Sequence, residues 1–423
     1  MNSSKNFISL AIVVSINLVI QFLFQWYIIT SLGAGIKTDA LFGAMALPQF
    51  ILVVLGGSLT MVLVPIIAKY AGDEFHLESW NYFHAVGILF SGIACLLFMT
   101  SSWWVALVLP GFKGENYELT VDLARINIIA MVFSALLSVQ LSISSAKGNF
   151  FRIEYTSIVA NVIAFVLLII LIKPYGIYVV AWVSVIRVIL QVVFLLKIMG
   201  PYRRPNFNSV TFKPAWKKLK PLIAGNAYYK TDSLVDRYLT SKGIAGELTL
   251  LSFAQQLYLA VNSILVKVLV NTMIPEMARV HALGDQKRFN AIFKKRLAIS
   301  FVYGFISWGA ILLIGEWFLG FIFSFKKMTP ADVHKLWLLL VLLGGYLLGD
   351  LIGSITSGAF YAKGDTATPT KIGTILFTLY IPIKIYCYIK FGIVGLAITV
   401  SAYQLTSITL KLFFLRQHLF KIR

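Results

Sequence analysis

The chain has 423 residues, of which 59% are hydrophobic and only 13% are charged. Soluble domains average about 25% charged residues, so this composition and a mean hydropathy of +0.83 exclude a soluble globular protein. The net charge of +20 does not indicate nucleic-acid binding, because the basic residues lie in loops beside apolar stretches, where membrane topology and anionic lipid headgroups explain them.

Apolar stretches long enough to cross about 30 Å of hydrocarbon follow one another along the whole chain. In the first half we expect membrane spans near 7–30, 42–68, 84–108, 121–145, 154–173 and 177–197. In the second half we expect them near 221–241, 249–273, 297–324, 333–361, 370–389 and 393–415. The first span lacks the small-residue cleavage site of a signal peptide, so we expect it to be a retained transmembrane helix. The sequence therefore predicts an all-α polytopic membrane protein with twelve transmembrane helices.

A Pro-rich, basic loop at 198–220 is the natural division between two six-helix lobes, 1–197 and 221–423. Because six is an even number, both lobes keep the same orientation in the membrane. We therefore expect them to be related by a pseudo-twofold axis along the membrane normal, with a central cavity between them.

Three motifs of the first half return in the second half. The pairs are Val64-Pro65-Ile66 with Ile274-Pro275-Glu276, Ala146-Lys147-Gly148-Asn149 with Ala362-Lys363-Gly364-Asp365, and Tyr175-Gly176-Ile177 with Phe391-Gly392-Ile393. The last two pairs are separated by the same number of residues in both halves. Duplicated helical bundles are typical of secondary transporters, so the repeat favours a transport function.

When both termini are placed in the cytoplasm, most Lys and Arg residues outside the spans lie on the cytoplasmic side. The positive-inside rule therefore predicts that both termini are cytoplasmic. The sequence shows neither a large extramembrane segment nor clustered acidic and His residues, so we expect no enzyme.

Cys95 and Cys387 lie inside predicted spans, which argues against a disulfide framework or a zinc site. We expect no cofactor and no metal.

Charged residues inside a bilayer are unfavourable by about 2.5–3.5 kcal/mol each, so they usually face a cavity or a partner. In the seventh predicted span, Lys230 and Arg237 share one helical face, and Asp232 and Asp236 lie on a nearly opposite one. One face can line the cavity while the other pairs with neighbouring helices. The two acidic residues could equally neutralise the basic ones, leaving no role in substrate binding.

Polar stripes mark two further predicted helices. In the eighth span, Gln256, Ser263, Lys267 and Asn271 follow a single line at 100° per residue. In the first span, Asn17, Gln21 and Gln25 occupy successive i+4 positions. Ammonium and guanidinium groups make charge-assisted hydrogen bonds to phosphate and carboxylate oxygens, so a cavity lined by these stripes suits an anionic substrate.

Each of three other charged residues has two possible roles. Arg125 either lines the cavity or extends to the membrane surface from the outer end of its span. Lys384 either pairs with Asp236 or lines the transport pathway. Asp39, with Thr38, is expected to cap the second helix, and Asp39 is also a candidate for ion coupling or charge pairing.

A series of motifs along nearly the whole chain resembles the MurJ/MviN branch of the MOP flippase superfamily. The residues are Thr38-Asp39-Ala40-Leu41-Phe42, Leu47-Pro48, Val64-Pro65, Arg125-Ile126, Asn161, Asp236, Ile274-Pro275, Ala359-Phe360-Tyr361-Ala362 and Asp365-Thr366-Ala367-Thr368-Pro369. The resemblance implies a V-shaped, two-lobed bundle that works by alternating access.

The function implied is a flippase that moves an undecaprenyl-diphosphate-linked glycan from the inner to the outer leaflet of the bacterial inner membrane, for cell-envelope polysaccharide synthesis. The substrate-binding residues expected in the central cavity are Lys267, Arg237, Lys230, Gln256, Gln21, Gln25 and Arg125. Ion coupling or charge pairing is assigned to Asp236, Asp232, Lys384 and Asp39. The expected partners are the anionic lipid-linked glycan and membrane lipids; other polysaccharide-assembly proteins are candidates.

The chain departs from the family's peptidoglycan-precursor flippases in three ways. Those proteins carry arginines in the first helix, where this chain has Gln21 and Gln25, and an arginine in the eighth helix, where it has Gln255 and Gln256. They also have fourteen helices rather than the twelve expected here. These departures favour a lipid-linked glycan other than the peptidoglycan precursor. The alternative function is a cation-coupled, MATE-like exporter of small amphipathic molecules, with Asp232 and Asp236 as its carboxylates.

Overall fold

The computed structural model describes residues 3–323 and 327–419; the side chains of residues 3–11, 150, 221, 226, 264, 267, 268, 271, 418 and 419 lie outside the description. The chain divides into two compact units, Met1–Gly246 and Glu247–Arg423. Helices make up 88% of the structure, and the described residues contain no strand. The predicted all-α class is confirmed, and the lobe boundaries at 197 and 221 stay a prediction.

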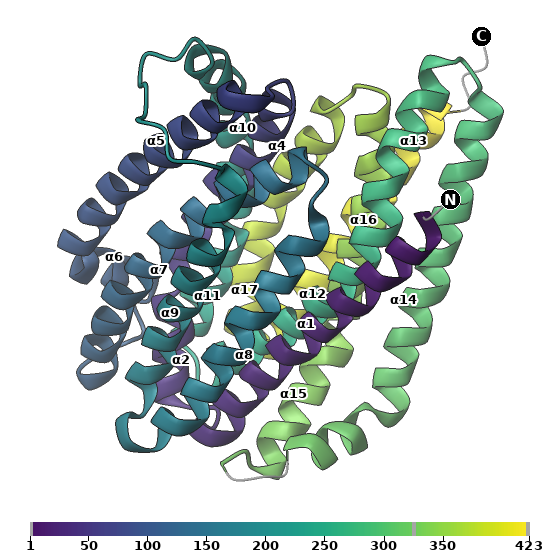
Figure 1. The fold of residues 1–423 in the computed structure, drawn as a ribbon. Coiled ribbons are helices and arrows are strands. Elements are labelled where there is room, and N and C mark those ends of the chain that lie inside the picture. Colours follow the sequence, from purple (N-terminus) through teal and green to yellow (C-terminus); the bar gives the residue numbers. More distant parts are fainter. Residues whose placement is uncertain (1–2, 324–326, 420–423) are drawn as a thin grey trace. The chain divides into compact units, whose positions relative to one another are not determined.

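The first unit consists of helices joined by short turns, except for the longer loop that precedes α10 (Figure 1). They are α1 (Ser3–Leu32), α2 (Ile36–Ala44), α3 (Ala46–Ile51), the π-helical turn η1 (Leu52–Gly56), α4 (Gly57–Ile67), α5 (Gly72–Met99), α6 (Ser101–Val108), α7 (Glu115–Ala146), α8 (Phe150–Tyr175), α9 (Ile177–Leu195), the 3₁₀ turn η2 (Leu196–Met199), α10 (Phe212–Lys230) and α11 (Asp232–Thr240). Within this unit α7 is central, since it packs against α2, α4, α5 and α9, while α1 packs along α8.

The second unit contains fewer but longer helices. They are α12 (Glu247–Leu265), the π-helical turn η3 (Val266–Val270), α13 (Asn271–Ala282), α14 (Gln286–Phe323), α15 (Pro330–Leu342), α16 (Gly344–Ala362) and α17 (Ala367–Leu419). Here α16 is central and contacts α12, α13, α14 and α17.

Eight helices within the described residues are long and apolar enough to cross a membrane, and nine if the bent pair α15–α16 forms one span. One of these is α17, in which Gly392 has non-helical angles and divides the helix where two predicted spans meet. The stretches predicted as the seventh and eighth spans are helical but are not among the eight. The third span lies earlier than predicted, because α5 ends at Met99 and the chain turns at Thr100. The count of twelve and the lobe symmetry stay predictions.

The sequence repeat corresponds to repeated backbone geometry. Gly176 and Gly392 both adopt left-handed angles, with φ of 64° and 58° and ψ of −139° and −145°. Gly148 and Gly364 also match, with φ of 71° and 80°. Such angles strain any residue with a Cβ atom, which explains why glycine stands at all four positions. In each unit the helix that contains the repeated proline also carries a π-helical turn.

The predicted linker folds onto the first unit instead of forming a free connection. The Glu78 carboxylate on α5 accepts hydrogen bonds from the Ser209 and Thr211 hydroxyls, both at 2.7 Å. The backbone N–H of Asn206 donates to the Asn81 side chain at 2.6 Å. Arg203 forms an ion pair with Asp73 at 2.7 Å. These bonds hold residues 203–211 against the start of α5, and α10 begins at Phe212, inside the predicted linker.

Gly111 is a point of close approach between two loops of the first unit. A Cβ atom added there would lie 1.9 Å from the backbone oxygen of Ser241, and its N–H donates to the Ser241 hydroxyl at 3.3 Å. The loop after α6 therefore packs directly on the loop after α11.

We expect Gly111→Ala to destabilise the protein by about 1–3 kcal/mol, the usual effect of overpacking. Thermal unfolding in detergent measures this change. The matched control is Gly92→Ala, because a Cβ atom at Gly92 meets no atom within 4 Å. A melting temperature of Gly111→Ala equal to that of the unsubstituted protein would show that the two loops do not pack closely.

Candidate functional site

A network of buried polar side chains joins three helices of the first unit. The Asn17 amide on α1 donates to Glu154 Oε2 at 2.9 Å and to Ser157 Oγ at 3.1 Å, both on α8. The Asn161 amide donates to Asn17 Oδ1 at 2.8 Å. Arg187 on α9 donates to Asn161 Oδ1 at 3.4 Å. Asn17, Glu154, Ser157 and Asn161 are each at most 9% exposed, so the network lies in an apolar interior where unpaired polar groups are costly.

The uncharged stripe predicted in the first span is part of this network. The Gln21 side chain donates to Asn17 Oδ1 at 3.3 Å, and Gln25 lies one turn further along, partly buried. The Arg187 guanidinium is 5.7 Å from the centroid of the Phe24 ring, also on α1. A cation from α9 therefore lies beside the part of α1 at residues 12–32, which contains no charged residue. Sequence analysis missed the roles of Glu154 and Arg187, although both are charges in predicted spans.

Arg237 on α11 is held by a side chain of α3. Its Nη2 atom donates to Gln49 Oε1 at 2.7 Å. The prediction of a shared face for Lys230 and Arg237 assumed one continuous helix, whereas the helix is interrupted at Thr231. The shared face itself stays a prediction. Lys230 is exposed at the end of α10, 5.9 Å from the centroid of the Tyr229 ring.

The two acidic residues of α11 have different surroundings. Asp232 is the first residue of the helix, where a carboxylate interacts favourably with the helix dipole. Asp236 is one turn further along and only 5% exposed. A buried carboxylate requires a partner, and this agrees with a charge-pairing role for Asp236.

Asp39 connects the start of α2 to the end of the first unit. Its Oδ2 atom accepts the backbone N–H of Gly246 at 2.6 Å, and the side chain is 4% exposed. Of the helix cap predicted for Thr38 and Asp39, the Thr38 part is present, because the Thr38 hydroxyl accepts the N–H of Gly35 at 3.0 Å. The cap lies there because α2 begins at Ile36, before the predicted boundary.

Arg125 is held within the first unit near the start of α6. Its Nε atom donates to Ser101 Oγ at 3.1 Å, and its guanidinium is 3.7 Å from the Asp122 carboxylate. The guanidinium also lies 5.4 Å from the centroid of the Phe98 ring. These contacts hold Arg125 among side chains of α5, α6 and α7, and both interpretations of this residue stay predictions.

In the second unit, η3 interrupts the polar stripe predicted on the eighth span. Residues 266–270 form a π-helical turn, so the rotation per residue changes before Lys267 and the straight line from Gln256 does not continue. Gln256 is partly buried on α12, and the side chains of Lys267 and Asn271 lie outside the described residues. Lys384 on α17 is fully buried. Its pairing with Asp236 stays a prediction.

Groups of three or more His, Cys, Asp or Glu residues that could hold a metal ion do not occur within 3–323 and 327–419.

Comparison with known proteins gives one consistent family. The chain matches the family model described as lipid II flippase MurJ over residues 28–422. A curated lipid II flippase MurJ of Burkholderia cenocepacia is 22% identical over 82% of this chain and 71% of the relative. A probable lipid II flippase MurJ of Rickettsia prowazekii is 25% identical over 84% of this chain and 72% of the relative.

Solved structures show the same fold. A lipid II flippase MurJ in an inward closed conformation matches with a TM-score of 0.84 at 21% identity, over 97% of this chain and 87% of that chain. An inward-facing MATE multidrug transporter of the MOP superfamily matches with a TM-score of 0.79 at 14% identity, over 97% of this chain and 98% of the other. At these identities the structures establish the fold alone.

We expect Asp39→Ala to leave the buried N–H of Gly246 without its acceptor, which is unfavourable by about 1–3 kcal/mol. Hydrogen exchange of the peptide containing residues 241–246 should become faster. Asp122→Ala is the control, because the Asp122 side chain is 51% exposed. Unchanged exchange in Asp39→Ala would contradict the hydrogen bond to Gly246.

Proposed function

Because the chain belongs to the MurJ family of lipid II flippases, we propose that it moves lipid II, the lipid-linked peptidoglycan precursor, from the inner to the outer leaflet of the bacterial inner membrane. The observation that carries the proposal is the family match over residues 28–422. Proteins of this family are multi-pass inner-membrane transporters and not enzymes.

Lipid II replaces the other lipid-linked glycan that sequence analysis favoured. That expectation depended on glutamines at 21, 25, 255 and 256, where relatives have arginines, and on the predicted count of twelve helices. Arg187 supports the revision, because its guanidinium lies beside Phe24 of α1 and bonds to Asn161. A basic group next to the first helix can thus come from α9 instead of from α1.

We assign the diphosphate of the substrate to the basic side chains Arg237, Lys267 and Lys230. Guanidinium and ammonium groups donate to phosphate oxygens in charge-assisted bonds, which are about twice as strong as neutral ones. The hydrogen bond from Arg237 to Gln49 supports this role, since a neutral amide orients the guanidinium without cancelling its charge. Gln256, Gln21, Gln25 and Arg125 are the further substrate-binding residues of the proposal.

Transport by alternating access can use the membrane potential. Outward movement of a negative charge is favoured by an inside-negative potential, by about 2.3 kcal/mol per charge per 100 mV. Asp236, Asp232, Lys384 and Asp39 are proposed to pair charges or couple ions during the cycle. Both termini are proposed to be cytoplasmic, since the Lys and Arg distribution follows the positive-inside rule.

A flipping assay in liposomes tests this proposal. We expect the reconstituted protein to move fluorescent lipid II between leaflets, faster under a potential that favours outward movement of anions. Arg237→Ala and Lys267→Ala should each slow transfer about tenfold or more, because each removes a charge-assisted hydrogen bond. The control is Lys213→Ala, an exposed basic residue at the start of α10.

Three outcomes would contradict the proposal. Transfer of an undecaprenyl-diphosphate oligosaccharide but not of lipid II would indicate that the substrate is a lipid-linked glycan other than lipid II, as the sequence favoured. Efflux of cationic dyes without lipid transfer would indicate the MATE-like exporter. Full lipid II transfer by Arg237→Ala and Lys267→Ala would remove these residues from the site.

A further inference from the structure

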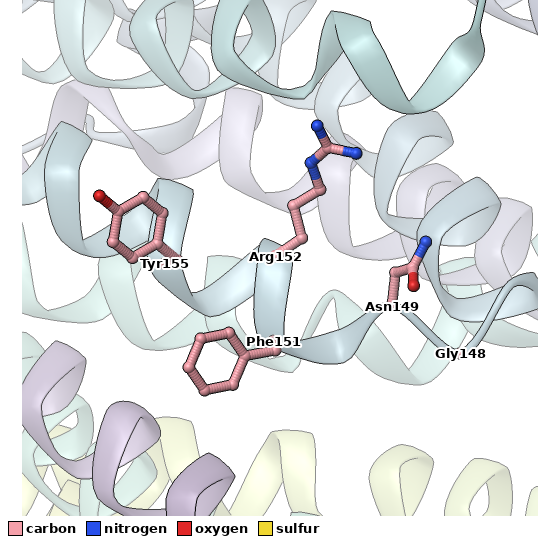
Figure 2. Close-up of a pocket in the computed structure, with 5 residues that line it drawn as sticks. All are labelled: Gly148, Asn149, Phe151, Arg152 and Tyr155. Carbon is pink, nitrogen blue, oxygen red and sulfur yellow. The ribbon is translucent and has the colours of Figure 1, made fainter. Parts of the chain in front are cut away.

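An open hollow of about 510 Å³ lies at the turn between α7 and α8. Its lining residues are Gly148, Asn149, Phe151, Arg152 and Tyr155, shown in Figure 2. None of them belongs to the substrate site assigned above, and the lining contains one positive charge and no carboxylate.

The lining side chains recur at helical spacing along the first turns of α8. Phe151 and Tyr155 are four residues apart, and Arg152 stands between them. The two rings are 51% and 59% exposed. The Arg152 guanidinium points away from the Phe151 ring (Figure 2). Among the described residues, neither the Arg152 guanidinium nor the Asn149 side-chain amide has a hydrogen bond or ion pair.

The repeated turn in the second unit shows that the fold does not require these side chains. There Asp365 stands at the position of Asn149, and its carboxylate accepts the backbone N–H groups of Ala367 and Thr368 at 3.0 and 2.9 Å. Thr368 takes the place of Arg152. The same left-handed glycine is present in both turns. Arg152 and its aromatic neighbours are therefore additions to a turn that forms without them.

The hollow lies at the end of a candidate membrane span. Phe151 is the first residue of the span Phe151–Tyr175, and the predicted topology places this turn on the cytoplasmic side. Exposed aromatic rings with a basic residue are typical of the membrane interface, where lipid phosphates lie.

We propose that the hollow binds the phosphodiester headgroup of an anionic phospholipid in the cytoplasmic leaflet. The Arg152 guanidinium donates to the phosphate oxygens, and the Asn149 amide and Tyr155 hydroxyl bond to polar groups of the headgroup. Phe151 contacts the start of an acyl chain. One guanidinium matches the single negative charge of a phosphodiester, whereas a diphosphate carries more charge than this lining neutralises. The proposal does not depend on the identity of the transported substrate.

Native mass spectrometry of the purified full-length protein tests this site. The protein is titrated with phosphatidylglycerol, with phosphatidylcholine as the zwitterionic comparison and farnesyl diphosphate as a lipid diphosphate. We expect phosphatidylglycerol to bind and Arg152→Gln to weaken that binding about tenfold, the effect of losing one charge-assisted hydrogen bond. Arg152→Lys should retain part of the affinity, because it keeps the charge without the planar fork.

The matched control is Arg288→Gln, which removes the same charge from an exposed position on α14, outside the hollow. Equal phosphatidylglycerol binding by Arg152→Gln and Arg288→Gln would overturn the proposal and leave Arg152 as a side chain that only extends to the interface. Binding of farnesyl diphosphate that depends on Arg152, without such binding of phosphatidylglycerol, would also overturn it. Thermal unfolding of each variant confirms that the protein is folded.

Discussion

The packing of α1 on α8 depends on one side chain, Asn17, in a helix that is otherwise largely apolar. In lipid, apolar surfaces gain little from association with each other, so interhelical hydrogen bonds and close packing decide how helices pair. Asn17 bonds to three side chains of α8, and through Asn161 the network reaches Arg187 on α9. A shift of α1 by one turn would break these bonds and leave Glu154 buried without its amide partner. The network thus fixes α8, which carries the phospholipid site proposed at Arg152, and places Arg187 beside α1.

The two copies of the repeated turn, at 146–149 and 362–365, show which of its features are shared by both units and which differ. The repeated lysines make the same kind of contact, since Lys147 lies 3.9 Å from the centroid of the Phe75 ring and Lys363 lies 5.1 Å from that of Phe289. The side chains that follow differ, because Asp365 caps its helix and Asn149 does not. The backbone of the turn is therefore kept in both units, and its chemistry differs between them.

The sequence predicted the bounds of α1, α8 and α9 well, because these helices coincide with long apolar stretches. It also identified the repeat, whose glycines adopt matching angles in the structure. It did not predict the interruption at Thr231 or the π-helical turn at 266–270, because both assignments assumed 100° per residue throughout. The partner of Asp39 was also missed, since Gly246 is distant in the sequence and contributes only a backbone N–H. The docking of the linker on Glu78 depends on Ser and Thr hydroxyls, which carry no distinctive pattern.

The proposed function is the movement of lipid II across the bacterial inner membrane. The most direct measurement is the accumulation of lipid II in the cytoplasmic leaflet of cells depleted of their own lipid II flippase and supplied with this chain. The account predicts that the accumulated lipid II falls to the level of undepleted cells and that growth continues. Unchanged accumulation and lysis, with the chain correctly inserted in the membrane, would contradict it.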